Sequence, residues 1–274
     1  MRVRAEDARV LITVKTAPQP SEKYGDTVCV AGIRIDGGRH EWVRLYPIAF
    51  RWLDKDAQFK KYDIVDLEVR RRDQDTRPES YSPTKDSIKV VKHLADWKAR
   101  QSILQDVPRT TTCELRREAL KRHDAPSLGM IGVASIDAVR FEPHPGWNEA
   151  EQRKIAKAFD QTRTSLFGSD HMPPVLVTPR FKFGYRYHCM DSHCPGHTGQ
   201  LLDWELNELE RRIHGDDKTL KAEVTKRFRD MIFAPTRETS FYMGNFEDPK
   251  KRQNFSVLGV HYPTRGVAES ATLL

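Results

Sequence analysis

Short runs rich in apolar and β-branched residues, some of them alternating with polar residues, dominate the first ninety positions of the chain. Such runs occupy residues 10–14, 27–33, 40–46, 62–70 and 87–91. They are rich in β-branched side chains and are separated by prolines and glycines, which is typical of strands joined by turns. The pair Gly37-Gly38 directly precedes the third run, so the pattern predicts a hairpin there. Several short strands at this spacing indicate a small sheet or barrel.

The middle of the chain changes to a helical pattern. Apolar residues recur at helical spacing among many charges over residues 93–123, with an interruption near Pro108 and the threonines that follow it. A strand is predicted over 131–141. Two prolines and a glycine then fall within 142–146, where no regular element can cross. We therefore expect a division into a part spanning 1–145 and a part spanning 146–274.

The second part mixes both kinds of element. Asn148 and Glu151 form an N-cap pair that predicts the start of a helix running through Phe159. The remaining periodic segments predict strands at 175–177, 181–187, 240–243 and 255–260, and helices at 202–213 and 220–232. The sequence thus predicts an α+β protein. Its mainly β N-terminal part precedes an α+β part with a Cys/His loop and two helices, and no internal repeat is visible.

Composition narrows the class of protein. Hydrophobic residues make up 38% of the 274 positions, yet no window of eighteen consecutive apolar residues exists. The first residues also lack the apolar stretch of a secretory signal. We therefore expect a cytoplasmic protein without a membrane partner. Its four cysteines are expected to be reduced, because a chain of this length in a reducing compartment gains no disulfide framework from them.

The net charge of +7 permits attraction to phosphate backbones. Up to Gly146 the chain holds 27 basic and 22 acidic residues, so most of the excess lies in the part predicted to be β-rich. That basic, strand-rich part resembles small β-barrel modules that bind RNA or DNA. The likeness is one of architecture and transfers no residue. DNA or RNA is accordingly the expected partner.

The strongest chemical signal is the loop from His188 to His197, which holds two cysteines and three histidines. Thiolate and imidazole are the ligands that zinc prefers, and the Cys-x4-Cys-x2-His spacing fits one ion. The predicted ligands are Cys189, Cys194, His197 and His188. For the fourth position the alternatives are His193, a distant Cys29 or Cys113, or a carboxylate. The expected cofactor is zinc, with another divalent metal as the alternative.

Acidic residues follow this loop closely. A helix beginning around Thr198 would carry Asp203 and Glu205 in its first turns, near the predicted metal. Three protein ligands and a water would make a catalytic site, with Asp203 or Glu205 as general base and His193 as a further catalytic candidate. Two other interpretations stay open. The metal could have a purely structural role and hold the loop together, or the cysteines could be ordinary buried residues without a metal.

Basic and aromatic residues interleave in the first part of the chain, as single-stranded nucleic acid requires. The candidate nucleic-acid-binding residues are Arg44, Tyr46, Arg51, Trp52, Arg70, Arg71 and Arg72. The alternative for these residues is a solvated face with aromatic packing. Two weaker candidates are the Asp66, Glu68 and Arg70 face of one strand, as a divalent metal site, and Asn245, which turn chemistry otherwise explains.

These features lead to one preferred function and two alternatives. The preferred hypothesis is a nucleic-acid-processing enzyme, either a metal-dependent hydrolase or nuclease or an enzyme that modifies a base. The first alternative is a non-enzymatic nucleic-acid-binding module with a structural zinc loop. The second is an interaction subunit of a larger assembly. Glycine-rich phosphate loops and the Gly-x-Ser-x-Gly elbow are absent from the sequence.

Overall fold

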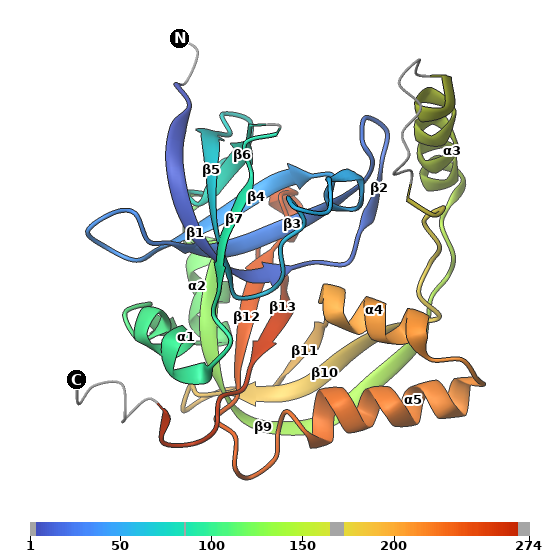
Figure 1. Cartoon of the computed structure of the whole chain (residues 1–274). Coiled ribbons are helices and arrows are strands. Elements are labelled where there is room, and N and C mark those ends of the chain that lie inside the picture. The colour runs from blue at the N-terminus through green and yellow to red at the C-terminus, as the bar shows by residue number, and fades with distance from the viewer. Residues whose placement is uncertain (1–3, 85, 165–172, 268–274) are drawn as a thin grey trace.

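The computed structural model describes residues 4–84, 86–164 and 173–267, which form two β-sheets flanked by helices (Figure 1). The strands of the first sheet are β1 (Glu6–Lys15), β2 (Gln19–Ser21), β3 (Gly25–Arg34), β4 (Glu41–Ile48), β5 (Asp63–Arg71), β6 (Ser80–Pro83) and β7 (Lys89–His93). The predicted hairpin is confirmed, since β3 and β4 pair in antiparallel register. Inward-facing Val65, Leu67 and Val69 alternate with more exposed residues along β5, which explains the sequence pattern.

Five strands of the first sheet close into a barrel. Their order is β1-β3-β4-β6-β5, and β1 also pairs with β5, which completes the ring. All neighbours are antiparallel except β4 and β6, which run parallel. This is the five-stranded Greek-key arrangement of an OB-fold barrel. Its interior is filled by side chains such as Val10, Val30 and Leu45, each at most 1% exposed.

The second sheet repeats this arrangement. Its strands are β8 (Arg109–Thr110), β9 (Leu128–Pro143), β10 (Phe181–Cys189), β11 (His197–Gln200), β12 (Ser240–Asn245) and β13 (Phe255–His261). The order is β11-β10-β9-β12-β13, and a parallel bridge between Leu201 and Val257 brings the chain after β11 beside β13. The sheet therefore has the same circular strand order as the first barrel. Two barrels of one topology stand in a chain whose sequence has no visible repeat.

Helices fill the connections. They are α1 (Trp97–Leu104), α2 (Thr112–Lys121), α3 (Glu149–Thr164), α4 (Trp204–Arg212), α5 (Asp217–Thr225), and the short η1 (Phe50–Trp52), η2 (Lys226–Asp230) and η3 (Pro249–Lys251). Leu206 of α4 and Leu220 of α5 join the core of the second barrel. Helix α3 lies to one side and contacts β2 and β3 of the first barrel (Figure 1).

The predicted α+β class, with a mainly β N-terminal part, is confirmed. The interruption of the 93–123 helix is also confirmed, because α1 and α2 are separate helices with β8 between them. The N-cap pair of α3 forms as predicted: the Glu151 amide donates to Asn148 Oδ1 at 2.9 Å, and the Asn148 amide donates to Glu151 Oε2 at 2.8 Å.

Two element predictions were wrong. Residues 175–177 form no strand, because they have no ladder partner; Val175 and Val177 are 57% and 64% exposed. The helix predicted from around Thr198 begins at Trp204 instead, since residues 197–200 pair with β10 as a strand. The division at 145/146 stays a prediction. Strand β9, which precedes it, is paired with β10 and β12 of the second sheet.

Among the described residues, no helix has the length and apolar character needed to cross a membrane.

Candidate functional site

Four side chains from three places in the chain converge on one point. Sγ of Cys113, Cys189 and Cys194 and a ring nitrogen of His197 all lie within 4.8 Å of one another. Cys113 Sγ lies 3.3 Å from His197 Nε2, and Cys189 Sγ lies 3.7 Å from Cys113 Sγ and 3.5 Å from Cys194 Sγ. A Cys3His set at this spacing could hold a metal ion.

The loop between β10 and β11 builds most of this cluster. Cys189 ends β10, His197 begins β11, and the backbone amide of Cys189 donates to Cys194 Sγ at 3.4 Å. Gly196 adopts a φ of +85°, and a side chain there would also press on the His188 ring. The loop therefore needs glycine at this position to turn Cys194 and His197 toward the same point.

Helix α2 supplies the fourth donor. Cys113 is the second residue of that helix, whose N-cap Thr111 accepts a hydrogen bond from the Glu114 amide at 3.0 Å. Burial and the neighbouring thiols Cys189 and Cys194 raise the pKa of Cys113 to about 12. Burial lowers the pKa of His197, which keeps its imidazole neutral. Three thiols and a neutral imidazole so close together are the donor set that a divalent cation stabilises, because the cation removes the repulsion between thiolates.

The geometry distinguishes between the residues considered for the fourth ligand position. Cys113 is the fourth member of the cluster. His188 lies outside the cluster and directs Nδ1 toward Asp137 Oδ1 at 3.3 Å. His193 is exposed, and its backbone amide donates to Asp191 Oδ1. Cys29 accepts a contact from Arg44 Nη1 at 3.2 Å. The predicted role of His188 as a ligand therefore has no support in the geometry.

The two carboxylates proposed as bases are separate from the cluster. Asp203 is the N-cap of α4, where its Oδ1 accepts from the Glu205 amide at 2.7 Å. Its Oδ2 lies 3.6 Å from Lys61 Nζ of the first barrel, and both side chains are buried. Burial raises the pKa of Asp203 to about 6, although Lys61 opposes the shift. Glu205 is exposed. Asp203 therefore joins the two barrels, and neither carboxylate belongs to the Cys3His cluster.

Three of the predicted nucleic-acid-binding residues are engaged inside the protein. Arg44 is 2% exposed and donates from Nη2 to the carbonyl of Ser127 at 3.0 Å. Arg51 Nη1 and Trp52 Nε1 both donate to Asp26 Oδ2, at 2.9 and 3.2 Å. Because β4 lies between the two barrels at Arg44, the strict alternation of exposed and buried residues expected for this strand breaks down.

The other predicted residues lie closer to solvent. Arg70 and Arg71 are exposed at the end of β5. The Arg72 guanidinium lies 5.1 Å from the centre of the Tyr46 ring, and that of Arg71 lies 5.7 Å from the ring centre of Tyr81. These distances are within the range of cation–π interactions. On the same strand, Asp66 is paired with Arg9 at 2.6 Å, which is an ordinary surface ion pair.

A cavity of about 650 Å³ opens between the barrels. We call it the interbarrel pocket. Its wall is formed by the following residues: Thr16, Ala17, Gln19, Cys29, Arg44, Tyr46 and Arg77 of the first barrel, and His144–Asn148, Glu151, Lys182, Gln200, Leu202, Gly244–Glu247, Ser256 and Leu258 of the second part. In the first barrel these residues belong to the second and third barrel strands and to the loops that follow the first and fourth. The second part contributes the same segments, together with Gly244 and Asn245 of its fourth strand, Ser256 and Leu258 of its fifth, and Leu202 after its third.

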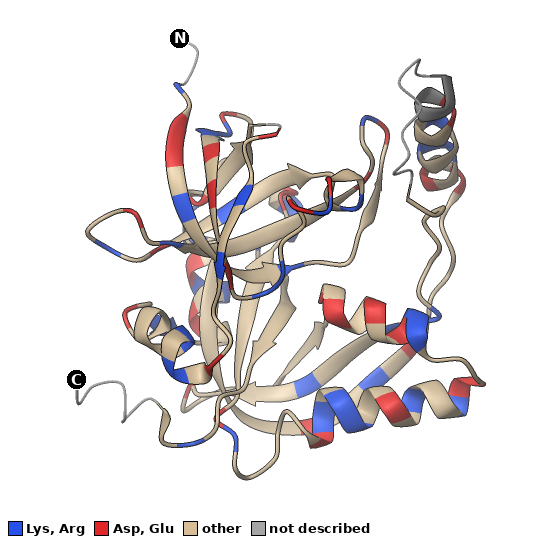
Figure 2. Ribbon diagram, in the orientation of Figure 1, with Lys and Arg blue, Asp and Glu red and all other residues tan. Residues whose placement is uncertain are grey.

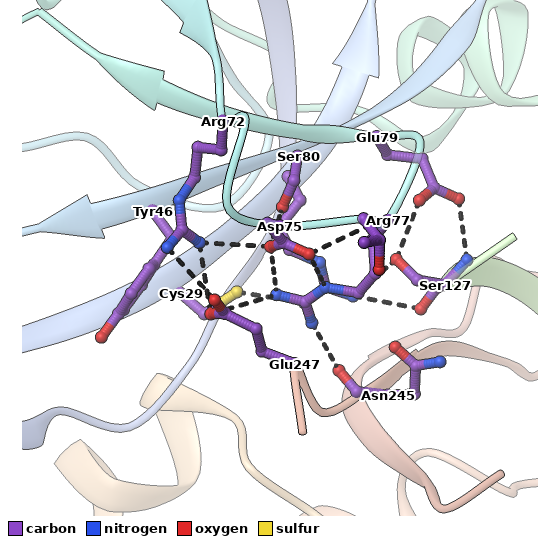
Figure 3. Close-up of polar contacts among 12 residues, drawn as sticks. Cys29, Tyr46, Arg72, Asp75, Arg77, Glu79, Ser80, Ser127, Asn245 and Glu247 are labelled. Atoms are coloured by element: carbon purple, nitrogen blue, oxygen red, sulfur yellow. Dashed lines mark hydrogen bonds and ion pairs between the residues drawn. The ribbon is translucent and has the colours of Figure 1, made fainter. Parts of the chain in front are cut away.

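A buried polar network stands behind one wall of the pocket (Figure 3). Arg77 forms a fork with Asp75, at 2.8 Å from Nε to Oδ1 and 2.7 Å from Nη2 to Oδ2. Ser80 also donates to Asp75. The remaining Arg77 nitrogen, Nη1, donates to the backbone carbonyl of Asn245 at 3.0 Å. This network fixes the loop between β5 and β6 against the end of β12.

Two polar atoms at the pocket wall lack a hydrogen-bond partner among the described residues. They are Oδ1 of Asn245, whose residue is 7% exposed, and Nε of Arg44. Asn245 Nδ2 is satisfied by the carbonyl of Arg252 at 2.9 Å. A buried polar group without a partner is costly, so each of these two atoms is an uncompensated polar group at the pocket wall. Asn245 was predicted only as a weak candidate.

Charge alone does not single out a binding face. Figure 2 shows acidic and basic residues together along α4 and α5. Many of the exposed arginines and lysines are paired with carboxylates, for example Lys157 with Glu22 and Arg140 with Glu142. The interbarrel pocket is thus distinguished by its shape and its donors, and not by a concentration of positive charge.

Comparison with models of known protein families identifies the family of this chain. A model of a domain of unknown function (DUF8757) matches residues 108–274, which is more than half of the chain. The chain belongs to the DUF8757 family. A second model, also a domain of unknown function (DUF8758), matches residues 6–106. The two matches meet at residue 107, directly before β8. No curated protein matches the chain.

Solved structures with similarity to this DUF8757 chain are remote. The Ifi202 HINa domain in complex with a 20 bp double-stranded DNA has 5% identity and a TM-score of 0.34, with 95% of this chain and 100% of that chain covered. A murine DNA-binding protein bound with double-stranded DNA has 8% identity and a TM-score of 0.32, with 94% of each chain covered. A single-stranded DNA-binding protein from Thermus aquaticus has 13% identity and a TM-score of 0.18, with 96% and 95% covered. At these scores the likeness carries no argument about function.

The sequence missed the interbarrel pocket because its wall comes from many distant segments. The proline and glycine pattern at 142–146 did mark the loop that carries Trp147, although as a boundary. The Gly244-Asn245 pair was visible as a turn, yet its burial against the first barrel had no signal in the local pattern.

Proposed function

We propose that this chain is a nucleic-acid-binding module whose Cys3His cluster holds a structural zinc ion. The observation that carries the proposal is the convergence of corresponding segments of both barrels on the interbarrel pocket. In OB-fold barrels, oligonucleotides bind on the face of the second and third strands and on the loops after the first and fourth. In this chain those faces adjoin. The argument from fold to function is one of analogy.

The surface chemistry beside the pocket supports a single strand over a duplex. Tyr46 and Tyr81 are half-buried, so part of each ring stays accessible for an unpaired base. Arg71 lies over the Tyr81 ring and would contact a phosphate of the same strand, whereas Arg72, over Tyr46, is paired with Asp75 and Glu247. Lys182 on β10 adds a cation on the side of the second barrel. Phosphate contacts would supply affinity, and the aromatic rings would stack on unpaired bases of the strand.

Zinc fits the donor set of the metal cluster. Zn–S and Zn–N distances of about 2.3 and 2.0 Å give a tetrahedron with edges of about 3.8 Å between sulfurs and about 3.5 Å between sulfur and nitrogen. The distances of 3.5 and 3.7 Å between sulfurs and of 3.3 and 3.6 Å from sulfur to His197 Nε2 agree with these edges. Four protein donors complete the coordination. Zinc would then tie α2 to the β10–β11 loop and stabilise the second barrel.

An enzymatic function has no support from this geometry. A catalytic zinc keeps a coordination position for water, whereas three cysteines and one histidine fill all four. Asp203, one of the carboxylates considered as a base, is ion-paired with Lys61 and caps the N-terminus of α4. The proposal is therefore the non-enzymatic alternative, in which the metal supplies rigidity and the pocket supplies recognition.

Fluorescence anisotropy with labelled oligonucleotides tests this function. We expect the protein to bind a single strand of ~20 nucleotides more tightly than the matching duplex, with affinity falling steeply between about 50 and about 300 mM salt. Replacing Arg71 or Lys182 with Ala should weaken binding and reduce the log-log salt slope by about 0.7 per lost phosphate contact. Lys121→Ala on α2, which does not line the pocket, is the matched control. Affinity that does not respond to salt, or no binding at all, would overturn the proposal.

A further inference from the structure

We infer that the interbarrel pocket accepts one unstacked nucleobase as a neutral planar ligand. The inference deepens the proposed function and rests on it for the biological source of the base. The pocket itself can be tested without any polymer. Its argument comes from four properties of the wall: aromatic rings, unsatisfied polar atoms, balanced charge and size.

Aromatic rings come to the pocket from three separate segments. Tyr46 lies in β4 two residues before its end, Trp147 follows β9, and Phe246 follows β12. The Trp147 indole is held by a hydrogen bond from Nε1 to the Leu176 carbonyl at 3.3 Å and by an edge contact with His144 at 5.4 Å between ring centres. Phe246 is 45% exposed, which is unusual for so large an apolar side chain. Stacking on a planar ligand would explain why the Phe246 ring is exposed at the pocket.

The polar atoms of the wall suit the edge of a heterocycle. Asn245 Oδ1 accepts and Arg44 Nε donates, and both are buried without a partner among the described residues. Gly244 lies next to Arg44, since a Cβ added at Gly244 would stand 3.2 Å from Arg44 Nη2. The two side chains thus provide an acceptor and a donor, which are the kinds of group that the edge of a base pairs with.

The charges of the wall favour a neutral group over a polyphosphate. Arg77 is already neutralised by Asp75, at 2.7 Å. Arg72, next to the pocket at Tyr46, lies 3.4 Å from Glu247, and Glu151 also lines the wall. Arg44 and Lys182 are the cations of the lining for which the structure gives no ion pair among the described residues, and Glu151 and Glu247 are its carboxylates. A base therefore fits inside, while its sugar and phosphate would stay at the mouth.

The size of the pocket agrees with this ligand. A volume of about 650 Å³ falls within the range of about 300–1,000 Å³ for small-molecule sites and leaves room for either a purine or a pyrimidine. Two sources could deliver the same chemistry: a free nucleoside or nucleotide, or a base turned out of a bound single strand. The experiment below separates them.

Calorimetric titration of the full chain with nucleosides and their 5′-monophosphates is the primary test. We expect saturable binding of at least one base, with the nucleoside and its monophosphate differing by less than about threefold, because the phosphate stays outside a charge-balanced pocket. Phe246→Ala and Trp147→Ala should each weaken this binding by at least about fivefold, since stacking on one ring contributes about 1–3 kcal/mol. Tyr24→Ala removes another exposed ring, outside the pocket, and should leave binding unchanged.

Phe246 is exposed, so its variant should fold even if the Trp147 variant does not. The inference is overturned if no nucleoside binds at millimolar concentration, or if Phe246→Ala and Tyr24→Ala bind equally well. Binding of a nucleoside but not of its oligonucleotide would support the pocket and identify a free nucleotide as its ligand, while removing the proposed function. Oligonucleotide binding that Arg71→Ala weakens, but that neither Phe246→Ala nor a competing nucleoside affects, would leave the proposed function standing and remove the pocket inference.

Discussion

Arg77 Nη1 donates a 3.0 Å hydrogen bond to the backbone carbonyl of Asn245, which joins the last loop of the first barrel to the end of β12 in the second. The other guanidinium nitrogens of Arg77 are occupied by Asp75 (Figure 3). One buried side chain therefore fixes both the conformation of its own loop and the contact between barrels. Arg77 and Asn245 both line the interbarrel pocket, so this hydrogen bond is part of its wall.

Replacing Arg77 with Ala should destabilise the protein strongly. The change removes the guanidinium fork from the buried Asp75 carboxylate, which keeps only Arg72 Nη1 at 3.2 Å as an ionic partner, and it removes the link to Asn245. Breaking a buried pair in this way costs about 3–5 kcal/mol. Urea denaturation followed by circular dichroism measures the loss. Arg70→Ala, which changes an exposed arginine of the preceding strand, should shift the free energy of unfolding by less than about 0.5 kcal/mol. Equal effects of the two substitutions would show that the network contributes little.

Acid should weaken the same network. Burial alone would raise the pKa of Asp75, but hydrogen bonds from Arg77 and Ser80 outweigh it and hold that pKa well below its usual range. The unfolded chain therefore takes up the Asp75 proton first on acidification, near pH 4. The contribution is fully present above that pH and is lost as the pH falls further.

Unfolding free energies measured between about pH 6 and about pH 3 check this expectation, since the unfolded aspartate titrates near pH 4. Asp75→Asn should be less stable than the wild type at neutral pH and should show a shallower fall in acid. If both proteins lose stability in parallel across this range, Asp75 is not the group responsible.

Removal of metal should unfold the second barrel. We expect about one zinc per chain by elemental analysis, and a large drop in melting temperature when a strong chelator is added, because structural zinc couples directly to folding. Cys113→Ser should lose the metal as fully as Cys194→Ser, since both supply donors. Cys29→Ser retains the cluster and is the matched cysteine control. Full metal content in Cys113→Ser would contradict the Cys3His assignment.

Substitutions of Asp203 and Glu205 should affect the free energy of unfolding very differently, although the two residues lie only two positions apart. Asp203→Ala removes the N-cap of α4 and leaves Lys61 buried without its partner, which is expected to cost about 3–5 kcal/mol. Glu205→Gln changes an exposed carboxylate and should stay within about 0.5 kcal/mol of the wild type. Thermal and urea unfolding of the two variants measure the difference. A severe effect of Glu205→Gln would indicate a role that the structure does not provide.

The sequence was sufficient for features that depend on neighbouring residues. Side chains alternate along β5 because each strand has one face toward the barrel interior, so the pattern revealed it. Cys189, Cys194 and His197 lie in one tight loop, so their spacing predicted that they would cluster. The fourth member of the cluster did not follow from spacing. Cys113 lies 76 positions before Cys189 and reaches it only because α2 packs against the second barrel.

Tertiary structure alone decided the remaining features. The circular order of both barrels depends on the parallel pairing of β4 with β6 and on the parallel bridge from Leu201 to Val257, and no local periodicity encodes such long-range pairs. The alternating pattern of the strand predicts that Arg44 is exposed, yet Arg44 is buried because the second barrel covers that strand. The sequence by itself determined the strands and three of the four residues of the Cys3His cluster. The packing of α2 on the second barrel added Cys113 to that cluster. The packing of one barrel on the other determined the contact at Asp203 and the pocket, since each needs side chains that only a folded chain brings together.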